Sequence, residues 1–129
     1  MNEDKLKIRS FQDLDAWKEG HALVLMIYKN TKDFPREESF ALTSQIRRAA
    51  VSITSNIAEG FSRVSYKEKV NFYSTALGSL TEVKSQILIA RDVGYVSQES
   101  YNYIDEQIIK TSKIINGLIK KSKFIIHNS

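Results

Sequence analysis

Few side chains in this sequence could hold a metal ion. The chain has no cysteine, and its two histidines, His21 and His127, lie more than a hundred residues apart. Helical metal sites need ligands at short spacings, such as the Glu-x-x-His pairs of di-iron bundles, and neither histidine lies in one. We therefore expect no metal, no cofactor and no disulfide. His21 is expected on a core-facing stripe, in a packing role.

Candidates for a nucleophile are equally scarce. The sequence contains no glycine-rich phosphate loop, no G-x-S-x-G elbow and no paired-carboxylate arrangement. The hydroxyls of Ser52, Thr54 and Ser55 lie in the middle of an apolar helical pattern, where they would bond back to backbone carbonyls and permit close helix packing. We predict that the protein is not an enzyme.

One polar flank recurs at helical spacing. Its members, separated by three, four, four and three residues, are Gln45, Arg48, Ser52, Asn56 and Glu59. An ordinary solvated flank with intrahelical pairs would look the same. The alternative is a polar network at a helix or subunit contact, where such residues specify geometry more than they stabilise it. The sequence leaves both readings open.

The distribution of positive charge points to a possible partner. Nineteen Lys and Arg against fifteen Asp and Glu give a formal net charge of +4, a weak argument by itself. Residues 107–129, however, carry five lysines and no acid. The candidate nucleic-acid contacts are Arg36, Arg47, Arg63, Lys110, Lys113, Lys120, Lys121 and Lys123. Each could instead be plain solubilising charge, and we see no aromatic interleaving that would indicate base stacking.

These residues must be positioned by helices. Apolar residues recur at three- and four-residue spacings in four segments, about 13–32, 39–61, 65–93 and 97–125. The chain has one proline and five glycines, which disfavours a many-turned β fold. Short connections make sequential helices neighbours. The sequence thus predicts an all-α fold, one domain over 1–129, built as an antiparallel up-down-up-down four-helix bundle.

Each segment has a predicted core stripe. On the first, it comprises Leu14, Trp17, His21, Val24, Leu25 and Tyr28. On the second, it comprises Leu42, Ile46, Ala49, Ala50, Ile53 and Ile57. On the third, it comprises Tyr73, Ala76, Leu77, Leu80, Val83, Ile87 and Ala90. On the fourth, it comprises Tyr101, Ile104, Ile108, Thr111, Ile115, Leu118, Ser122 and Ile125.

A second apolar face runs along the first segment. Its residues, Ala16, Gly20, Leu23 and Ile27, lie roughly opposite the predicted core stripe. Gly78 and Glu82 lie on the outward side of the third segment. Either the bundle buries unusually wide faces, or these six residues form a subunit interface, because exposed apolar patches usually mark one. We expect a homo-oligomer.

The location of the protein follows from what the sequence lacks. Residues 1–5 contain no apolar core of a signal peptide, and charge breaks every apolar run before a bilayer could be spanned. We expect a cytoplasmic protein with no membrane contact.

A family resemblance rests on three stretches. The first stretch comprises Phe34-Pro35, Leu42–Ile53 and Ser55–Gly60. The second comprises Phe72-Tyr73, Ala76, Gly78–Leu80 and Glu82. The third is Gly94-Tyr95. Together they resemble the four-helix-bundle proteins encoded in intervening sequences of bacterial 23S rRNA genes. Relatives include the accessory variability determinant of diversity-generating retroelements. The resemblance covers about residues 11–120, and the family often has proline at the position of Thr54.

The resemblance implies a homopentamer of antiparallel bundles arranged as a barrel, without enzymatic activity. Five subunits of this charge would carry about +20. The retroelement relative binds a reverse transcriptase and nucleic acid through positively charged surfaces.

Two functions follow as expectations. The first is a non-enzymatic oligomeric adaptor that binds nucleic acid through basic surfaces, with RNA favoured as the partner and DNA left open. The second is a protein-binding scaffold for a partner enzyme such as a reverse transcriptase, with no nucleic-acid role of its own.

Overall fold

The computed structural model describes residues 7–129, which form helices and contain no strand. The predicted domain spans 1–129, so its first six residues lie outside the described part. The prediction that no signal peptide is present concerns residues 1–5, which also lie outside it. The elements are η2 (Phe11–Asp13), α1 (Asp15–Thr31), η3 (Arg36–Glu38), α2 (Leu42–Ser62), α3 (Tyr66–Asp92) and α4 (Gln98–His127). The four long helices differ from the predicted segments by one to three residues at each end.

Local signals account for where the helices begin and end. Ser65 and Ser97 cap α3 and α4, because each side-chain oxygen accepts a hydrogen bond from the backbone N–H three residues later. Gly94 follows α3 with a positive φ of 89°, which favours glycine at a helix C-terminus. Before α2, Pro35 leads into the short helix η3, so α2 begins at Leu42 rather than at 39.

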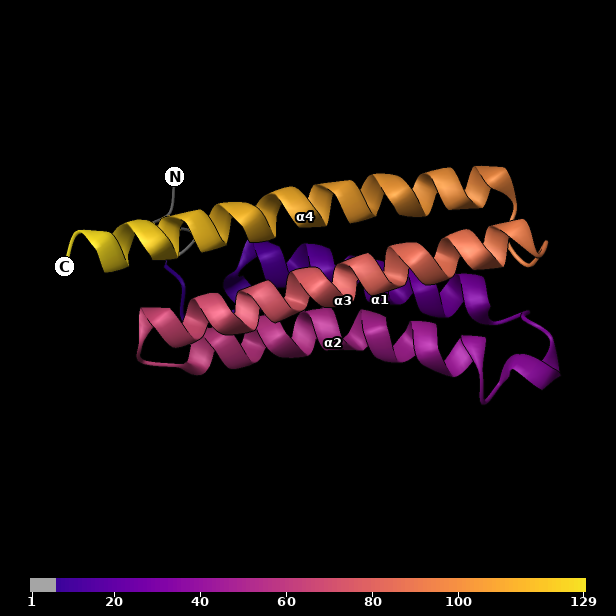
Figure 1. Ribbon diagram of the computed structural model, residues 1–129, viewed down its shortest axis with the longest axis horizontal. Helices are drawn as coiled ribbons and strands as arrows, with labels where there is room; N and C mark the ends of the chain where they lie inside the picture. The colour runs from indigo at the N-terminus through magenta and orange to yellow at the C-terminus, as the bar shows by residue number, and fades with distance from the viewer. Residues whose placement is uncertain (1–6) are drawn as a thin grey trace.

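The four long helices lie side by side in an elongated bundle (Figure 1). Each packs against two others: α1 and α3 both contact α2 and α4. The α1–α2 and α3–α4 connections lie at one end, while the α2–α3 connection and the C-terminus lie at the other (Figure 1). At the first of these ends, Tyr95 Oη donates a 2.8 Å hydrogen bond to Glu38 Oε2 and so ties the two connections together.

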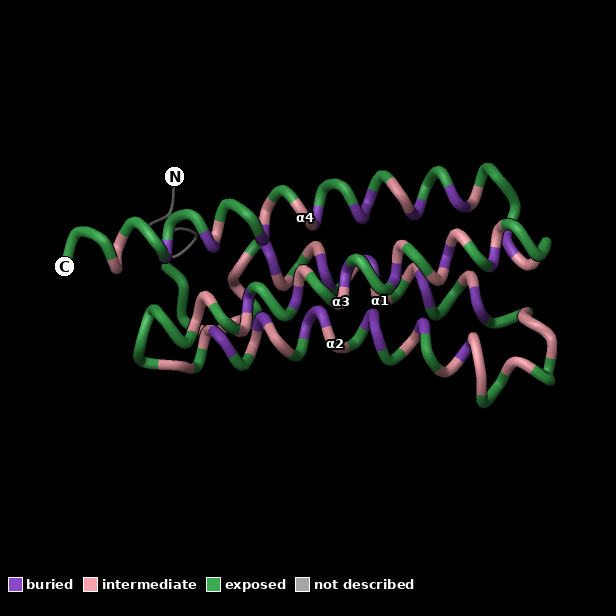
Figure 2. Tube along the Cα trace, viewed as in Figure 1, coloured by how far each residue is buried: buried purple, intermediate pink, exposed green. Residues whose placement is uncertain are grey.

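The core runs through the centre of the bundle, where buried positions recur along the facing sides of the helices (Figure 2). The stripes predicted on α2, α3 and α4 are confirmed, except that four members are only half-buried. These four are Leu42, Leu77, Leu118 and Ile125.

The stripe predicted on α1 is only partly right: Leu14, Trp17 and Val24 are half-buried and pack against the core, but the other three members do not. Its member Leu25 is 57% exposed, and His21 and Tyr28 are also exposed. The buried residues of α1 are instead Ala16, Gly20, Leu23, Ile27 and Thr31.

Four of the six residues predicted as a subunit interface therefore belong to the core of the subunit. The small residues of α1 explain the arrangement, because Gly20 lies against α2. A Cβ atom there would be 3.2 Å from Thr54 Cγ2 and 3.4 Å from Ile53 Cγ2. Close approach of the two helices buries Leu23 and Ile27 completely and turns the bulkier stripe outward. Gly78 and Glu82 remain exposed on α3.

Polar contacts join α4 to its neighbours. Gln107 Nε2 donates to the Glu19 carbonyl at 2.9 Å and to Glu19 Oε1 at 3.1 Å. On the α3 side, Lys84 forms an ion pair with Asp105. These contacts fix the register of α4 against both α1 and α3.

Within residues 7–129, no helix is long and apolar enough to cross a membrane.

Candidate nucleic-acid interface

The lysines of α4 form one exposed face. Lys113, Lys120, Lys121 and Lys123 are exposed, and none of them makes an ion pair or hydrogen bond within the described chain. At 100° per residue they span less than half a turn around the helix, away from the buried positions of α4. We call these four residues the lysine face. Positive charge concentrated in this way, with no acid over residues 107–129, suits a phosphate backbone.

The length of α4 increases the exposure of the lysine face. The helix has 30 residues, about 45 Å at 1.5 Å per residue. Its C-terminal turns extend past the α2–α3 connection, at the left of Figure 1. The fifth predicted lysine, Lys110, is also exposed, but its Nζ lies 3.4 Å from Glu19 Oε2. Part of its charge is therefore offset.

The predicted arginines do not join the lysine face. Arg63 lies at the α2–α3 connection, where its NH2 nitrogen is 2.5 Å from Glu59 Oε1 and its NH1 nitrogen is 3.9 Å from Glu68 Oε1. Two carboxylates thus compensate its charge. Arg36 and Arg47 belong to the opposite end of the bundle, near η3 and the start of α2. The eight predicted residues consequently do not form a single surface.

A second basic site lies between α1 and α2, and only the fold reveals it. It is a groove of about 790 Å³ lined by Tyr28, Ser39, Phe40, Thr43, Ser44, Arg47, Arg48, Val51, Ser52 and Ser55. We call it the α1–α2 groove. Two arginines, two aromatic residues, four serines and one threonine line it, and no carboxylate does. The Phe40 side chain is fully exposed, and Thr43 Oγ1 is buried without a hydrogen-bond partner.

Arg47 is held in place within this groove. Its Nε donates a 2.8 Å hydrogen bond to Thr31 Oγ1, and its guanidinium lies 4.6 Å from the centre of the Tyr28 ring. Its two terminal nitrogens have no partner among residues 7–129. An arginine ordered in this way presents both of them to an anion with little further loss of conformational entropy.

The polar flank of α2 is divided among several contacts. Ser52 Oγ lies 2.8 Å from Ser79 Oγ on α3, and Asn56 Nδ2 donates to the Ser52 carbonyl at 2.8 Å. Glu59 pairs with Arg63, as described above. The side chains of Gln45 and Arg48 are exposed, and within the described residues they have no bonded partner. The polar flank therefore makes one contact with α3, one hydrogen-bonded pair within α2 and one ion pair with Arg63. It does not form a continuous network.

Arg48 also lines a smaller groove between α2 and α3. Its other residues are Gln45, Ala49, Ser52, Glu82 and Gln86. Gln86 Oε1 is buried there without a partner, and Glu82 makes no ion pair with Arg48. Unpaired polar groups therefore remain on this face of the subunit.

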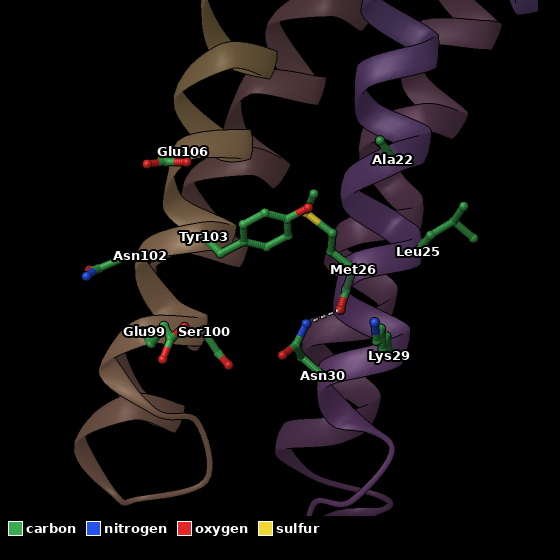
Figure 3. A pocket seen from close by; sticks show the side chains of 10 residues that line it. All are labelled: Ala22, Leu25, Met26, Lys29, Asn30, Glu99, Ser100, Asn102, Tyr103 and Glu106. Carbon is green, nitrogen blue, oxygen red and sulfur yellow. Dashed lines mark hydrogen bonds between the residues drawn. The ribbon is translucent and has the colours of Figure 1, made fainter.

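A cleft between α1 and α4 has a different chemistry. Tyr103 extends from α4 across the cleft towards Met26 on α1, and Asn30 Nδ2 bonds to the Met26 carbonyl at 2.8 Å (Figure 3). The cleft measures about 710 Å³, and Glu99 and Glu106 line its α4 side. Its carboxylates would repel phosphate, so this cleft suits an apolar segment of a protein rather than nucleic acid.

Neither His21 nor His127 belongs to a metal site among the described residues. Across residues 7–129 no three His, Cys, Asp or Glu side chains gather closely enough to hold a metal ion. His21 is not a core residue, because it is exposed and its ring stacks on that of Trp17 with centroids 4.7 Å apart. Thr54 Oγ1 bonds back to the Val51 carbonyl at 2.9 Å, the packing role expected of it.

Comparisons with known proteins give a family and a fold. The family model described as 23S rRNA-intervening sequence protein matches residues 12–117. A solved structure of a protein of unknown function from the S23 ribosomal protein family of Bacteroides thetaiotaomicron superposes with a TM-score of 0.73. It is 22% identical in sequence, and the alignment covers 81% of this chain and 98% of that one. No curated protein matches the sequence.

Proposed function

The chain belongs to the 23S rRNA-intervening sequence protein family, and from that premise we propose that it is a non-enzymatic, oligomeric adaptor that binds RNA. Membership alone assigns no activity, because the solved relative is itself described as a protein of unknown function. The observation that carries the proposal is the lysine face of α4, where four exposed lysines have no acidic partner.

Binding at the lysine face would be driven by the release of counterions from phosphates. Each neutralised phosphate contributes a slope of about −0.7 to −0.9 to a plot of log K against log salt. Association of several subunits would multiply these contacts on one particle and raise the avidity. We propose a homopentamer of antiparallel up-down-up-down bundles working in the cytoplasm.

The outer face of α2 and α3 is our candidate for the contact between subunits. A Cβ atom at Gly78 would meet nothing within 4 Å, so another helix could approach there. Glu82 and Arg48 are unpaired nearby, and Gln86 Oε1 is buried without a partner. Gly78→Lys would place a long charged side chain on this face and should lower the mass measured by light scattering with size exclusion. An unchanged mass would exclude α3 from the contact.

Fluorescence anisotropy of a labelled RNA hairpin, titrated at several salt concentrations, tests RNA binding. Replacing Lys120, Lys121 and Lys123 together with glutamine should weaken binding and reduce the salt slope by about 2 to 3. The matched control replaces the same three lysines with arginine, which keeps the charge. An unchanged slope in the glutamine variant would show that the lysine face does not contact RNA.

A second function is supported by the α1–α4 cleft. Tyr103 is 60% exposed there, and Leu25, a lining residue on α1, is 57% exposed. Exposed apolar residues with an acidic rim suit a protein partner, and a scaffold for an enzyme such as a reverse transcriptase would use them. Tyr103→Ala should weaken capture of such an enzyme without changing RNA affinity. Loss of RNA affinity in this variant would argue against a separate protein site.

A further inference from the structure

We propose that the α1–α2 groove binds an unpaired nucleotide of RNA, with its base on the Phe40 ring and its phosphate on Arg47. This inference rests on the proposed RNA binding and adds to it a separate site that distinguishes single strands from duplexes. The site lies near the opposite end of the bundle from the C-terminal lysines of α4 (Figure 1).

The first argument is charge. Arg47 and Arg48 are among the residues that line the groove, and its lining includes no Asp or Glu. The α1–α4 cleft, of similar volume, has two glutamates and one lysine instead. A phosphate would therefore be attracted to the first and repelled by the second.

The second argument is the aromatic surface. A fully exposed phenylalanine costs solubility and contributes nothing to the subunit core, so Phe40 is free to stack. Tyr28 has one side of its ring against Arg47, which leaves Phe40 as the open platform. Stacking of a base on such a ring is indifferent to base identity.

The third argument is the supply of hydrogen bonds. Four serines and Thr43 line the groove. The serine hydroxyls can donate hydrogen bonds to a phosphate oxygen and exchange them with a ribose hydroxyl. The 2′-hydroxyl of RNA both donates and accepts, which suits a hydroxyl-rich wall.

Duplex RNA should not use this site. Its bases are already stacked on one another, and only its phosphates and 2′-hydroxyls are presented along a helix. The groove is therefore expected to favour single strands, whereas the lysine face engages either form through phosphates.

The test compares a labelled 12-nucleotide oligouridylate with a labelled blunt-ended RNA duplex of 12 base pairs by fluorescence anisotropy. Phe40→Ala should weaken oligouridylate binding roughly tenfold, because stacking on an aromatic ring is lost. Its salt slope should stay unchanged, because no ion pair is removed, and duplex binding should also stay unchanged. Tyr103→Ala is the matched control, since it removes another exposed ring and should alter neither RNA affinity.

Arg47→Lys provides a second variant that keeps the charge. It loses the hydrogen bond to Thr31 and the stacking on Tyr28, so it should weaken oligouridylate binding several-fold at an unchanged salt slope. Lys67→Gln, which removes an exposed charge from α3, is the control for general electrostatics.

Crosslinking locates the base directly. Irradiation of the complex with an oligouridylate containing 4-thiouridine should attach it to the tryptic peptide of residues 37–47, which contains Phe40 and ends at Arg47. An adduct confined to the peptides of α4 would overturn the proposal.

The remaining outcomes separate the two proposals. If the wild-type protein binds neither RNA at low salt, both proposals fail. If it binds both but Phe40→Ala has no effect, the groove proposal alone fails. If Phe40→Ala instead lowers the molar mass in light scattering and leaves RNA affinity intact, the groove is a subunit contact and not a nucleotide site.

Discussion

Two leucines two residues apart on α1 give a sharp test of the packing. Leu23 is completely buried between α1 and its neighbours, whereas Leu25 is 57% exposed. The apolar pattern of the sequence assigns them the opposite way. We predict that Leu23→Ala strongly destabilises the protein and that Leu25→Ala does not.

The magnitudes follow from the two environments. Truncating a fully buried leucine removes its transfer free energy and leaves a cavity, at a cost of about 3 to 5 kcal/mol. A leucine with more than half its surface in water loses little, and substitution at such a site changes stability by about 0.5 kcal/mol. Both variants replace leucine with alanine in the same helix. The change in helix propensity is therefore equal in the two variants and cancels when their stabilities are compared.

Urea unfolding followed by circular dichroism measures the difference. With a slope of about 2 kcal/mol per molar urea, the midpoint of Leu23→Ala should fall by about 2 M. Leu23→Met is the control, since it roughly conserves volume and should cost less than about 1.5 kcal/mol. The titrations are run at two protein concentrations, because association of subunits would make the midpoints depend on concentration.

A larger loss in Leu25→Ala than in Leu23→Ala, at both concentrations, would refute the packing of α1 described here. An effect of Leu25→Ala at the higher concentration alone would place Leu25 in a contact between subunits.

Four further predictions concern other parts of the bundle. Gly117→Ala should raise stability by about 0.5 to 1 kcal/mol in thermal unfolding, because its Cβ would meet open space in the middle of α4. Gly60→Ala should instead destabilise by about 1 to 3 kcal/mol, because its Cβ would come within 2.7 Å of a buried aromatic ring. The hydrogen bond from Gln107 holds the pKa of Glu19 below its usual value, so this carboxylate stabilises the fold above about pH 4.5 and loses that effect as the pH falls through the lowered pKa. Glu19→Gln should therefore lose less stability than the wild type between neutral and acid pH in urea titrations. Ser97→Ala should cost about 1 kcal/mol by removing the cap of α4, while an alanine at the exposed Ser129 should change nothing in the same assay.

The sequence predicts the helices better than it predicts how α1 is oriented. On α4, the three- and four-residue spacing of Tyr101, Ile104, Ile108 and Ile115 identifies the buried side correctly, because the opposite side is polar. On α1 both sides are apolar, so periodicity alone has two solutions. Gly20 decides between them through the close approach of α2, and glycine contributes nothing to a hydrophobic pattern.

The candidate nucleic-acid interface could also be predicted only in part from the sequence. The lysine face could be predicted, because its residues lie on one helix and have no acidic neighbours in the sequence. The α1–α2 groove could not, because Tyr28, Phe40 and Arg47 come from three different elements that only the fold brings together. The ion pair between Arg63 and Glu59 could also be predicted, because the two residues lie four apart at the end of one helix, a spacing that brings their side chains together.

The contact between α1 and α4 has a consequence for how the protein is made. Glu19 receives its hydrogen bonds from Gln107, 88 residues later in the chain. Helices α2 and α3 are consecutive in the chain and can pair as soon as both have left the ribosome. Helix α1 can also pair with α2 early, but the side of α1 that faces α4 stays uncovered until α4 has been made. The nascent chain therefore depends on the last helix to close the bundle, and a ribosome that stalls before residue 107 would expose the apolar face of α1 to aggregation or to chaperones.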